Sequence, residues 1–252
     1  MKLSNVTYGS GPAISYLHGF TQTKESWLPV VEQLTNQYSH CIIDAPGHGS
    51  SPNGQRTLAQ AADDVAETMQ PGILVGYSMG ARIALHTALR HPSTVTSLVL
   101  VSGTAGIDST EERSARRSSD EALALHIADI GVEAFITEWL SNPLFAGLPS
   151  SLADIPSRCR NTETGLGDSL RYAGTGTQEP LWEQLKSLSI PVLIVAGEKD
   201  QKFIDNARRM NELLPNSEIH IMNKVGHTSH LEDVSQFREI FVQWLSGLKR
   251  HN

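Results

Sequence analysis

The sequence predicts an α/β fold with a mostly parallel central sheet, flanking helices and an inserted helical cap. Short apolar runs that end in turn residues alternate with helix-like segments, which is typical of a parallel sheet with right-handed crossovers. The runs lack polar alternation, as expected for strands that are covered on both faces. Between residues 106 and 188 this rhythm stops, and charged, helix-prone sequence replaces it.

Strands are expected at the short apolar runs, which are residues 13–17, 41–44, 72–75, 98–101 and 192–195. A further strand is expected at residues 218–222, where the alternation of strands and helices resumes. Helical patterns lie between or after them, at residues 27–34, 58–69, 79–90, 203–214 and 234–248. The third of these helices should end at His91, because Pro92 cannot continue it.

The chain of 252 residues is long enough for one large core or for two domains. We predict one α/β core, made of residues 1–105 and 189–252, with residues 106–188 inserted as a helical cap. Within the insertion, residues 111–117 and 132–140 have the clearest helical character.

Composition excludes several classes of protein. Apolar residues make up 39% and charged residues 19%, which is ordinary for a globular domain, and the net charge of −7 disfavours nucleic acid as a partner. No signal peptide or membrane span is predicted, so we expect a cytoplasmic protein, and a monomer. Cys41 and Cys159 lie far apart, outside any metal-ligand spacing, and no nucleotide motif is present. No metal or cofactor is therefore expected.

The segment Gly76-Tyr77-Ser78-Met79-Gly80 matches G-x-S-x-G directly after a predicted strand and at the start of a predicted helix. In this context Ser78 is predicted to be a nucleophile on a sharp turn, where a Cβ at either glycine would collide with the neighbouring strand or helix. The alternative is an ordinary glycine-rich turn.

A serine hydroxyl needs a base, and the base needs a carboxylate to hold its tautomer. Asp200 follows the strand at 192–195 and is the predicted acid, although it could instead cap the helix after it. His227 follows the last strand by a short loop and is the preferred base. His230, three residues later, remains a rival.

An oxyanion in the reaction must be met by fixed donors. The backbone N–H of Met79 is one candidate. The other is the N–H of Phe20, in the loop His18-Gly19-Phe20 after the first predicted strand, although this loop could be merely a turn.

Arginines indicate the substrate class. Arg82 lies four residues after Ser78, so one helical turn places it on the face of the nucleophile unless it turns aside into a surface ion pair. The cap adds Arg113, Arg116, Arg117, Arg158 and Arg160 to an acidic chain. A local basic lining of this kind suits a small polyanion, since arginine binds carboxylates in a bidentate manner. For each cap arginine, a solvated helix face is the alternative.

Together these residues resemble the α/β-hydrolase family over almost the whole chain. Six segments are more specific, and they are similar to the family of 2-succinyl-6-hydroxy-2,4-cyclohexadiene-1-carboxylate synthases of menaquinone biosynthesis. They are residues 76–82, 112–116, 142–145, 158–161, 174–182 and 197–203. The cap segments carry more weight than the triad, which every α/β hydrolase of this kind shares.

The resemblance implies a lyase that eliminates pyruvate from 2-succinyl-5-enolpyruvyl-6-hydroxy-3-cyclohexene-1-carboxylate. It implies that Arg82, Arg116 and Arg160 bind carboxylates. It also places His18, Tyr77, Trp139 and Phe145 at the substrate, although plain core packing is the alternative for the three aromatic residues. In the implied chemistry Ser78, with His227 and Asp200, helps to remove a ring proton, and no acyl-enzyme forms.

Two alternatives remain at this point. One is a carboxylesterase or C–C bond hydrolase of the same fold that acts on a small anionic substrate. The other is a receptor-like or scaffolding protein that keeps the pocket without turnover.

Overall fold

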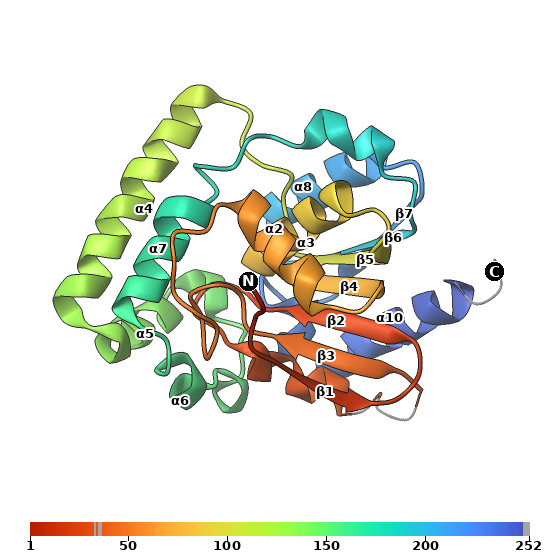
Figure 1. The fold of residues 1–252 in the computed structure, drawn as a ribbon, viewed down its shortest axis with the longest axis horizontal. Coiled ribbons are helices and arrows are strands. Elements are labelled where there is room, and N and C mark those ends of the chain that lie inside the picture. Colours follow the sequence, from red (N-terminus) through yellow and green to blue (C-terminus); the bar gives the residue numbers. More distant parts are fainter. Residues whose placement is uncertain (33, 35–36, 249–252) are drawn as a thin grey trace.

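The computed structural model describes residues 1–32, 34 and 37–248. They form a seven-stranded sheet with helices on both faces, and a group of helices extends beyond one end of the sheet (Figure 1). The α/β architecture predicted from the sequence is confirmed.

The strands run in the spatial order β1-β3-β2-β4-β5-β6-β7, and all neighbours are parallel except β1 and β3. All six predicted strands are present. β1 was not predicted, because it is an edge strand with four of its five residues exposed and so carries no continuous apolar run. The strands are β1 (Asn5–Gly9), β2 (Ala13–Leu17), β3 (Ser39–Ile43), β4 (Gly72–Tyr77), β5 (Val95–Val101), β6 (Val192–Gly197) and β7 (Ser217–Met222).

The helices beside the sheet follow the predicted pattern with two exceptions, the segment at 27–34 and a short helix at Ser229–Glu232 that was not predicted. The segment at 27–34 forms a 3-10 turn (Lys24–Trp27) and a short helix, α1 (Leu28–Val31), while residue 33 lies outside the described residues. The other core helices are α2 (Leu58–Thr68), α3 (Met79–Arg90), α8 (Gln201–Leu213), α9 (Ser229–Glu232) and α10 (Val234–Leu248). The start of α2 is fixed by a capping box between Thr57 and Gln60.

Alternate residues of each central strand enter two hydrophobic clusters, one on each face of the sheet. In β4, for example, Leu74 packs with residues of α2, α3 and α8, whereas Val75 packs with residues of α1 and α10. This two-sided burial explains why the central strands read as continuous apolar runs.

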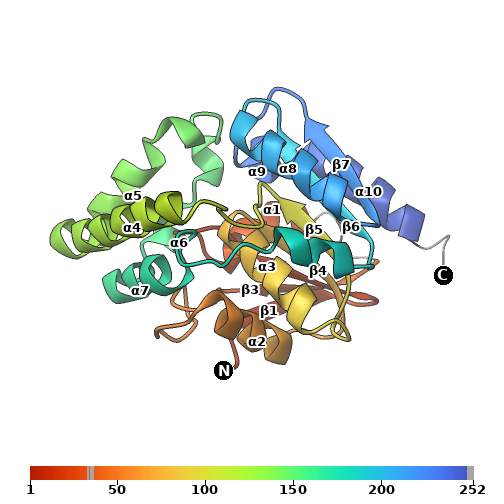
Figure 2. The ribbon, with the colours of Figure 1, turned by 90° about the horizontal axis from the view of Figure 1, so that it is seen from above.

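The inserted helices have a cluster of their own. They are α4 (Thr110–Ile130), α5 (Val132–Leu140), α6 (Ile155–Arg158) and α7 (Glu163–Ala173), with 3-10 turns at Pro143–Phe145 and Ser150–Leu152 between α5 and α6. The hydrophobic cluster of these helices includes the buried side chains of Ile127, Phe135 and Leu166. Seen from above, these helices lie beside the sheet domain (Figure 2). The 3-10 turn Trp182–Ser187 follows them, and its Trp182 and Leu185 already belong to the cluster of the sheet domain.

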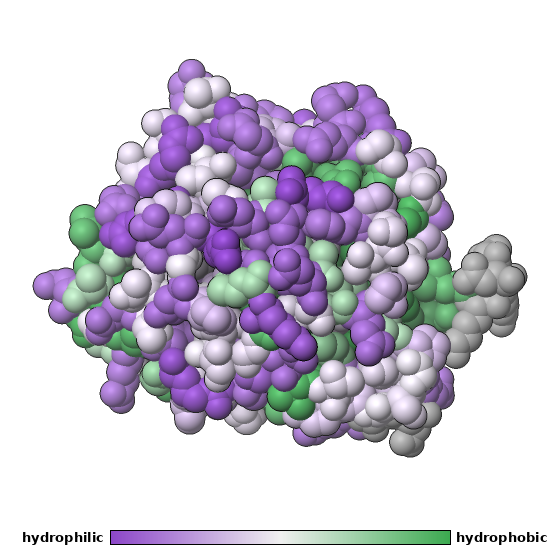
Figure 3. All heavy atoms as spheres, in the orientation of Figure 1, coloured by the Kyte–Doolittle hydropathy of each residue, from purple (hydrophilic) through white to green (hydrophobic). Residues whose placement is uncertain are grey.

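The surface in Figure 3 is mainly hydrophilic, with small scattered hydrophobic areas. Among the described residues, no helix combines the length and the apolar character that crossing a membrane requires.

Candidate active site

Ser78 lies on the turn between β4 and α3, with backbone angles φ 51° and ψ −107°. An L-residue adopts such a conformation only where its surroundings enforce it. A Cβ on Gly76 would lie 2.3 Å from the backbone oxygen of Gly80, and a Cβ on Gly80 would lie 2.3 Å from the backbone oxygen of Leu17. The two glycines of the motif are therefore required by close packing, as the sequence predicted.

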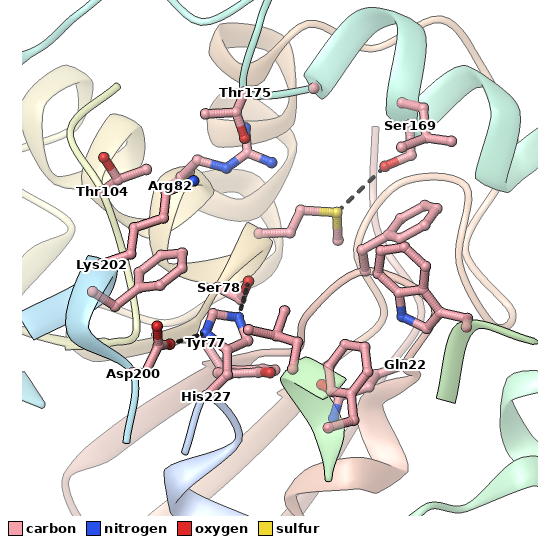
Figure 4. A pocket seen from close by; sticks show the side chains of 18 of the residues that line it. Gln22, Tyr77, Ser78, Arg82, Thr104, Ser169, Thr175, Asp200, Lys202 and His227 are labelled. Carbon is pink, nitrogen blue, oxygen red and sulfur yellow. Dashed lines mark hydrogen bonds and ion pairs between the residues drawn. The ribbon is translucent and has the colours of Figure 1, made fainter. Parts of the chain in front are cut away.

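Ser78, His227 and Asp200 are brought together at the carboxyl ends of β4, β7 and β6 (Figure 4). His227 Nε2 is 3.1 Å from Ser78 Oγ, and His227 Nδ1 is 2.6 Å from Asp200 Oδ2. An ionised carboxylate can only accept, so Nδ1 carries the proton and Nε2 is left to accept from the serine hydroxyl. This is the tautomer that a general base requires.

The two alternative roles considered for this region do not fit the geometry. Asp200 precedes α8, but its side chain caps no N–H of that helix and contacts His227 instead. The ring of His230 is fully buried, 4.5 Å from the ring centroids of both Trp27 and Tyr77. Neither of its ring nitrogens has a hydrogen-bond partner among the described residues, and burial lowers its pKa to about 3. His230 is not placed to act on Ser78.

Phe20 and Met79 both line the cavity beside Ser78. Within the described part of the chain, the backbone N–H of neither residue donates a hydrogen bond. The loop before Phe20 is held by Gln22, whose Oε1 accepts the N–H of Gly19 at 2.9 Å. Two donors therefore remain available next to the nucleophile, as an oxyanion site requires.

The cavity in front of Ser78 has a volume of about 340 Å³. Aromatic rings form much of its wall: Phe20, Tyr77, Trp139, Phe145 and Phe203. The ring centroids of Trp139 and Phe145 lie 5.6 Å apart, so these two rings are neighbours in the wall. The structure thus brings Tyr77, Trp139 and Phe145 to the cavity, where the sequence placed them.

Arg82 lines the same cavity and is only 7% exposed. Its Nη1 donates to the backbone oxygen of Ala173 at 2.7 Å, and it forms no ion pair with a carboxylate of the described residues. Desolvation lowers its pKa to about 10, so the guanidinium is still charged at neutral pH. Arg116 also lines the cavity, and its Nε is 2.8 Å from Oδ1 of the buried Asp120. The surface ion pair considered for Arg82 is not formed.

Arg160 lies outside the cavity, contrary to the sequence prediction. Its side chain is 51% exposed and pairs with Glu25 at 2.7 Å. Arg158, at the end of α6, lines the cavity instead and is 3% exposed. It donates to the backbone oxygen of Ala153 at 2.6 Å and to Thr21 Oγ1, and desolvation lowers its pKa to about 10. The two arginines are only two residues apart, one at the end of α6 and one in the turn after it, yet their side chains have different surroundings.

His18 is also placed differently from the prediction, because it is buried behind the cavity wall rather than in it. Its Nε2 accepts the N–H of Ala45 at 3.0 Å, so Nδ1 must carry the proton that it donates to the backbone oxygen of Gly19 at 2.8 Å. Burial lowers its pKa and keeps the ring neutral. His18 therefore supports the loop that presents Phe20.

Several polar residues of the cavity were not singled out from the sequence. They are Gln22, Thr104, Ser169, Thr175 and Lys202. Thr175 and Lys202 had a usable signal, since they fall within the segments 174–182 and 197–203 that carry the resemblance. Among the described residues, no group of three histidine, cysteine or acidic side chains is arranged to hold a metal ion.

A model of the alpha/beta hydrolase family matches residues 16–240, which is most of the chain. The chain belongs to the alpha/beta hydrolase family. Individual relatives give a more specific comparison than the family match does. This alpha/beta hydrolase is 37% identical over 251 residues to a protein of Bacillus subtilis named putative 2-succinyl-6-hydroxy-2,4-cyclohexadiene-1-carboxylate synthase, covering 94% of this chain and 91% of the relative.

A second relative, from Yersinia enterocolitica, carries the same synthase name without the qualifier. It is 30% identical over 246 residues, covering 94% of this chain and 88% of the relative. The solved structure of MenH from S. aureus superposes with a TM-score of 0.86 at 30% identity, over 98% of this chain and 99% of that one. A thermophilic esterase from Thermogutta terrifontis, bound to malate, shares the alpha/beta hydrolase fold at 22% identity, with a TM-score of 0.82 over 97% of this chain and 93% of that one.

The buried, neutral His230 predicts a pH dependence of stability. Its pKa is about 3 in the folded protein and roughly 6.5 in an unfolded chain, so only the unfolded state binds this proton between the two values. The free energy of unfolding should therefore fall as the pH drops below about 6.5.

His230→Phe removes the effect while keeping a ring between Trp27 and Tyr77. Urea unfolding at pH 7.5 and pH 5 should show about 2 kcal/mol more loss in the wild type than in the variant. Equal losses would contradict the burial of a neutral His230.

Proposed function

We propose that this chain is a lyase that eliminates pyruvate from 2-succinyl-5-enolpyruvyl-6-hydroxy-3-cyclohexene-1-carboxylate, giving 2-succinyl-6-hydroxy-2,4-cyclohexadiene-1-carboxylate in menaquinone biosynthesis. One observation carries the proposal: a serine with its base opens into a cavity that also contains buried arginines without a full set of anionic partners. The relatives named for this activity support it. The proposal includes a monomer in the cytoplasm, and it needs no metal or cofactor.

The arginines argue for a substrate with several carboxylates. Arg82 and Arg116 come from α3 and α4, whereas Arg158 comes from α6 and lies beside Tyr77, so the positive charge is divided between two parts of the cavity wall. Burying a guanidinium is costly unless an anion or several hydrogen bonds compensate it. A substrate with carboxylates at two ends would supply that compensation, and a neutral ester would not.

Ser78 and His227 are placed to move a proton. In the proposed reaction, His227 Nε2 takes the proton of Ser78 Oγ while Ser78 Oγ removes a ring proton of the substrate. Asp200 stabilises the imidazolium that results. The N–H groups of Phe20 and Met79 stabilise the enolate oxygen that develops. The C–O bond to the enolpyruvyl group then breaks, and the departing group takes up a proton to become pyruvate.

The helical insertion supplies the residues that make this site specific. We propose that residues 106–188 act as a cap over a core made of residues 1–105 and 189–252. Arg116, Trp139, Phe145 and Arg158 all come from the cap and line the cavity, whereas the triad comes entirely from the core. The chemistry thus belongs to the core and the recognition of the anion largely to the cap.

Ester hydrolysis is the second candidate, because the same triad and the same two N–H donors suit acyl transfer. An esterase or a C–C bond hydrolase acting on a small anionic substrate would use the arginines in a similar way. The two candidates differ in whether Ser78 becomes acylated or only transfers a proton, and an assay distinguishes them.

The next prediction concerns the reaction itself. Purified protein supplied with the enolpyruvyl cyclohexene substrate should release pyruvate, followed with a coupled dehydrogenase, and should turn over a simple nitrophenyl ester slowly by comparison. The reason is that a neutral ester leaves the buried arginines uncompensated. Fast ester turnover without pyruvate would contradict the lyase and favour the hydrolase.

Another prediction compares two arginines of the chain. Arg82→Ala should lower kcat/KM for pyruvate release, because it removes a charged hydrogen bond to the substrate. The loss should correspond to about 1.5–3 kcal/mol of transition-state stabilisation. Arg160→Ala is the matched control, since Arg160 is exposed and paired with Glu25, and it should leave kcat/KM within about twofold. Circular dichroism should show both variants folded. An unchanged value for Arg82→Ala, or an equal loss for Arg160→Ala, would contradict the assignment of the anion site.

A further inference from the structure

The loop that carries His227 has no regular structure of its own, yet it must keep Nε2 within 3.1 Å of Ser78. Asp200 fixes the ring through Nδ1, but a ring contact alone does not fix the backbone from which the ring extends. The backbone before and after His227 is held by two residues that have no place in the proton transfer itself: Ser102 and Glu232.

Glu232 uses both carboxylate oxygens on this loop. Its Oε2 accepts the N–H of Gly226 at 2.7 Å, and its Oε1 accepts the N–H of Thr228 at 3.1 Å. The two donors belong to the residues before and after His227, so the carboxylate holds the backbone on both sides of it. A rotation of the peptide between His227 and Thr228 would break the bond to Oε1. Hydrogen bonds to a carboxylate are roughly twice as strong as those between neutral groups.

Ser102 holds the carbonyl side of the same residue. Its Oγ donates to the backbone oxygen of His227 at 2.8 Å. Ser102 follows β5 with φ 48°, and its N–H donates to the backbone oxygen of Val195 in β6 at 2.8 Å. The hydroxyl is thus anchored to the sheet, which makes it a fixed point for the loop.

The cap contacts the same carboxylate. A Cβ built on Gly147, between the two 3-10 turns of the cap, would lie 2.0 Å from Oε2 of Glu232. Phe145 of the same cap segment has its ring centroid 6.4 Å from that of His227. The tip of the cap therefore rests directly on the residue that holds the base loop.

We propose that Glu232 is a positioning residue, which fixes His227 for proton transfer and links its placement to the seating of the cap at Gly147. Ser102 completes the hold from the side of the sheet. The inference rests on the proposed role of His227 as the base of Ser78, but not on the identity of the substrate.

The test uses a fluorophosphonate probe, which reports on the Ser78 and His227 pair without the natural substrate. Ser78 Oγ forms the P–O bond, the P–F bond breaks, fluoride leaves and His227 takes the serine proton. Glu232→Gln keeps the size of the side chain but turns an NH₂ group toward a backbone N–H. We expect labelling to slow by about 10- to 100-fold. With the enolpyruvyl substrate, kcat should fall while KM stays within about twofold. Labelling within about twofold of the wild type would overturn the proposal.

Gly147→Ala tests the link to the cap at an exposed position, where the three atoms nearest to the added Cβ all belong to the Glu232 side chain. It should slow labelling in the wild type by displacing the Glu232 carboxylate, and it should have little further effect in Glu232→Gln. Gly247→Ala is the matched control, because a Cβ there would meet nothing within 4 Å, and its labelling rate should be unchanged. No effect of Gly147→Ala, or an equal effect in both backgrounds, would overturn the link.

His227→Ala separates this inference from the proposed function. It should abolish labelling within the time course, since the base is then missing. Labelling of His227→Ala at the wild-type rate would contradict the role of His227 itself. Loss of labelling in His227→Ala together with normal labelling in Glu232→Gln would leave the base assignment intact and remove only the positioning role of Glu232.

Discussion

The left-handed backbone of Ser78 is the constraint on which the rest of the site depends. A conformation of this kind costs on the order of 1–3 kcal/mol and persists only where the surrounding structure enforces it. Here α3 packs so closely against β4 and the end of β2 that no side chain fits at Gly76 or Gly80. The turn leaves the serine hydroxyl at the carboxyl edge of the sheet, and it makes Met79 the first residue of α3, with its N–H unused by the helix. Because neighbouring strands are parallel, the loops after β6 and β7 end at the same edge and deliver Asp200 and His227 to that hydroxyl.

The charged residues of the cavity wall determine which class of substrate can bind next to Ser78. The chain carries a net charge of −7, yet the cavity wall contains Arg82, Arg116 and Arg158. Asp120 is buried against Arg116, so it offsets part of this charge, while Arg82 and Arg158 are hydrogen-bonded mainly to neutral acceptors. Their burial lowers their pKa values to about 10 but leaves them charged at neutral pH. Such cations gain most from an anion that enters the cavity, which is how an acidic protein can select a polycarboxylate.

The sequence was sufficient wherever a local pattern determines a position. Continuous apolar runs identified the five inner strands, the elbow motif identified Ser78, and the one-turn spacing placed Arg82 near it. The sequence was insufficient where tertiary contacts determine the position of a strand or a side chain. β1 is an exposed edge strand without an apolar pattern. His18 resembles a site residue in sequence, although both of its ring nitrogens are hydrogen-bonded to backbone groups. The choice between Arg158 and Arg160 depends on the direction of one short helix, α6, which has no periodicity to read. Glu232 gave no signal because its role lies in two backbone N–H groups that no motif describes.

The central claim is that Ser78 passes a proton and is never acylated. It is tested most directly by stopping the reaction with acid during steady turnover of the enolpyruvyl substrate and measuring the mass of the intact protein. The proposed chemistry predicts the unmodified mass at every time point while pyruvate accumulates, and Ser78→Ala should release pyruvate at least about 100-fold more slowly. An adduct that appears on Ser78 at the rate of turnover and disappears when substrate is exhausted would contradict the claim, since it would show that the serine carries an acyl group.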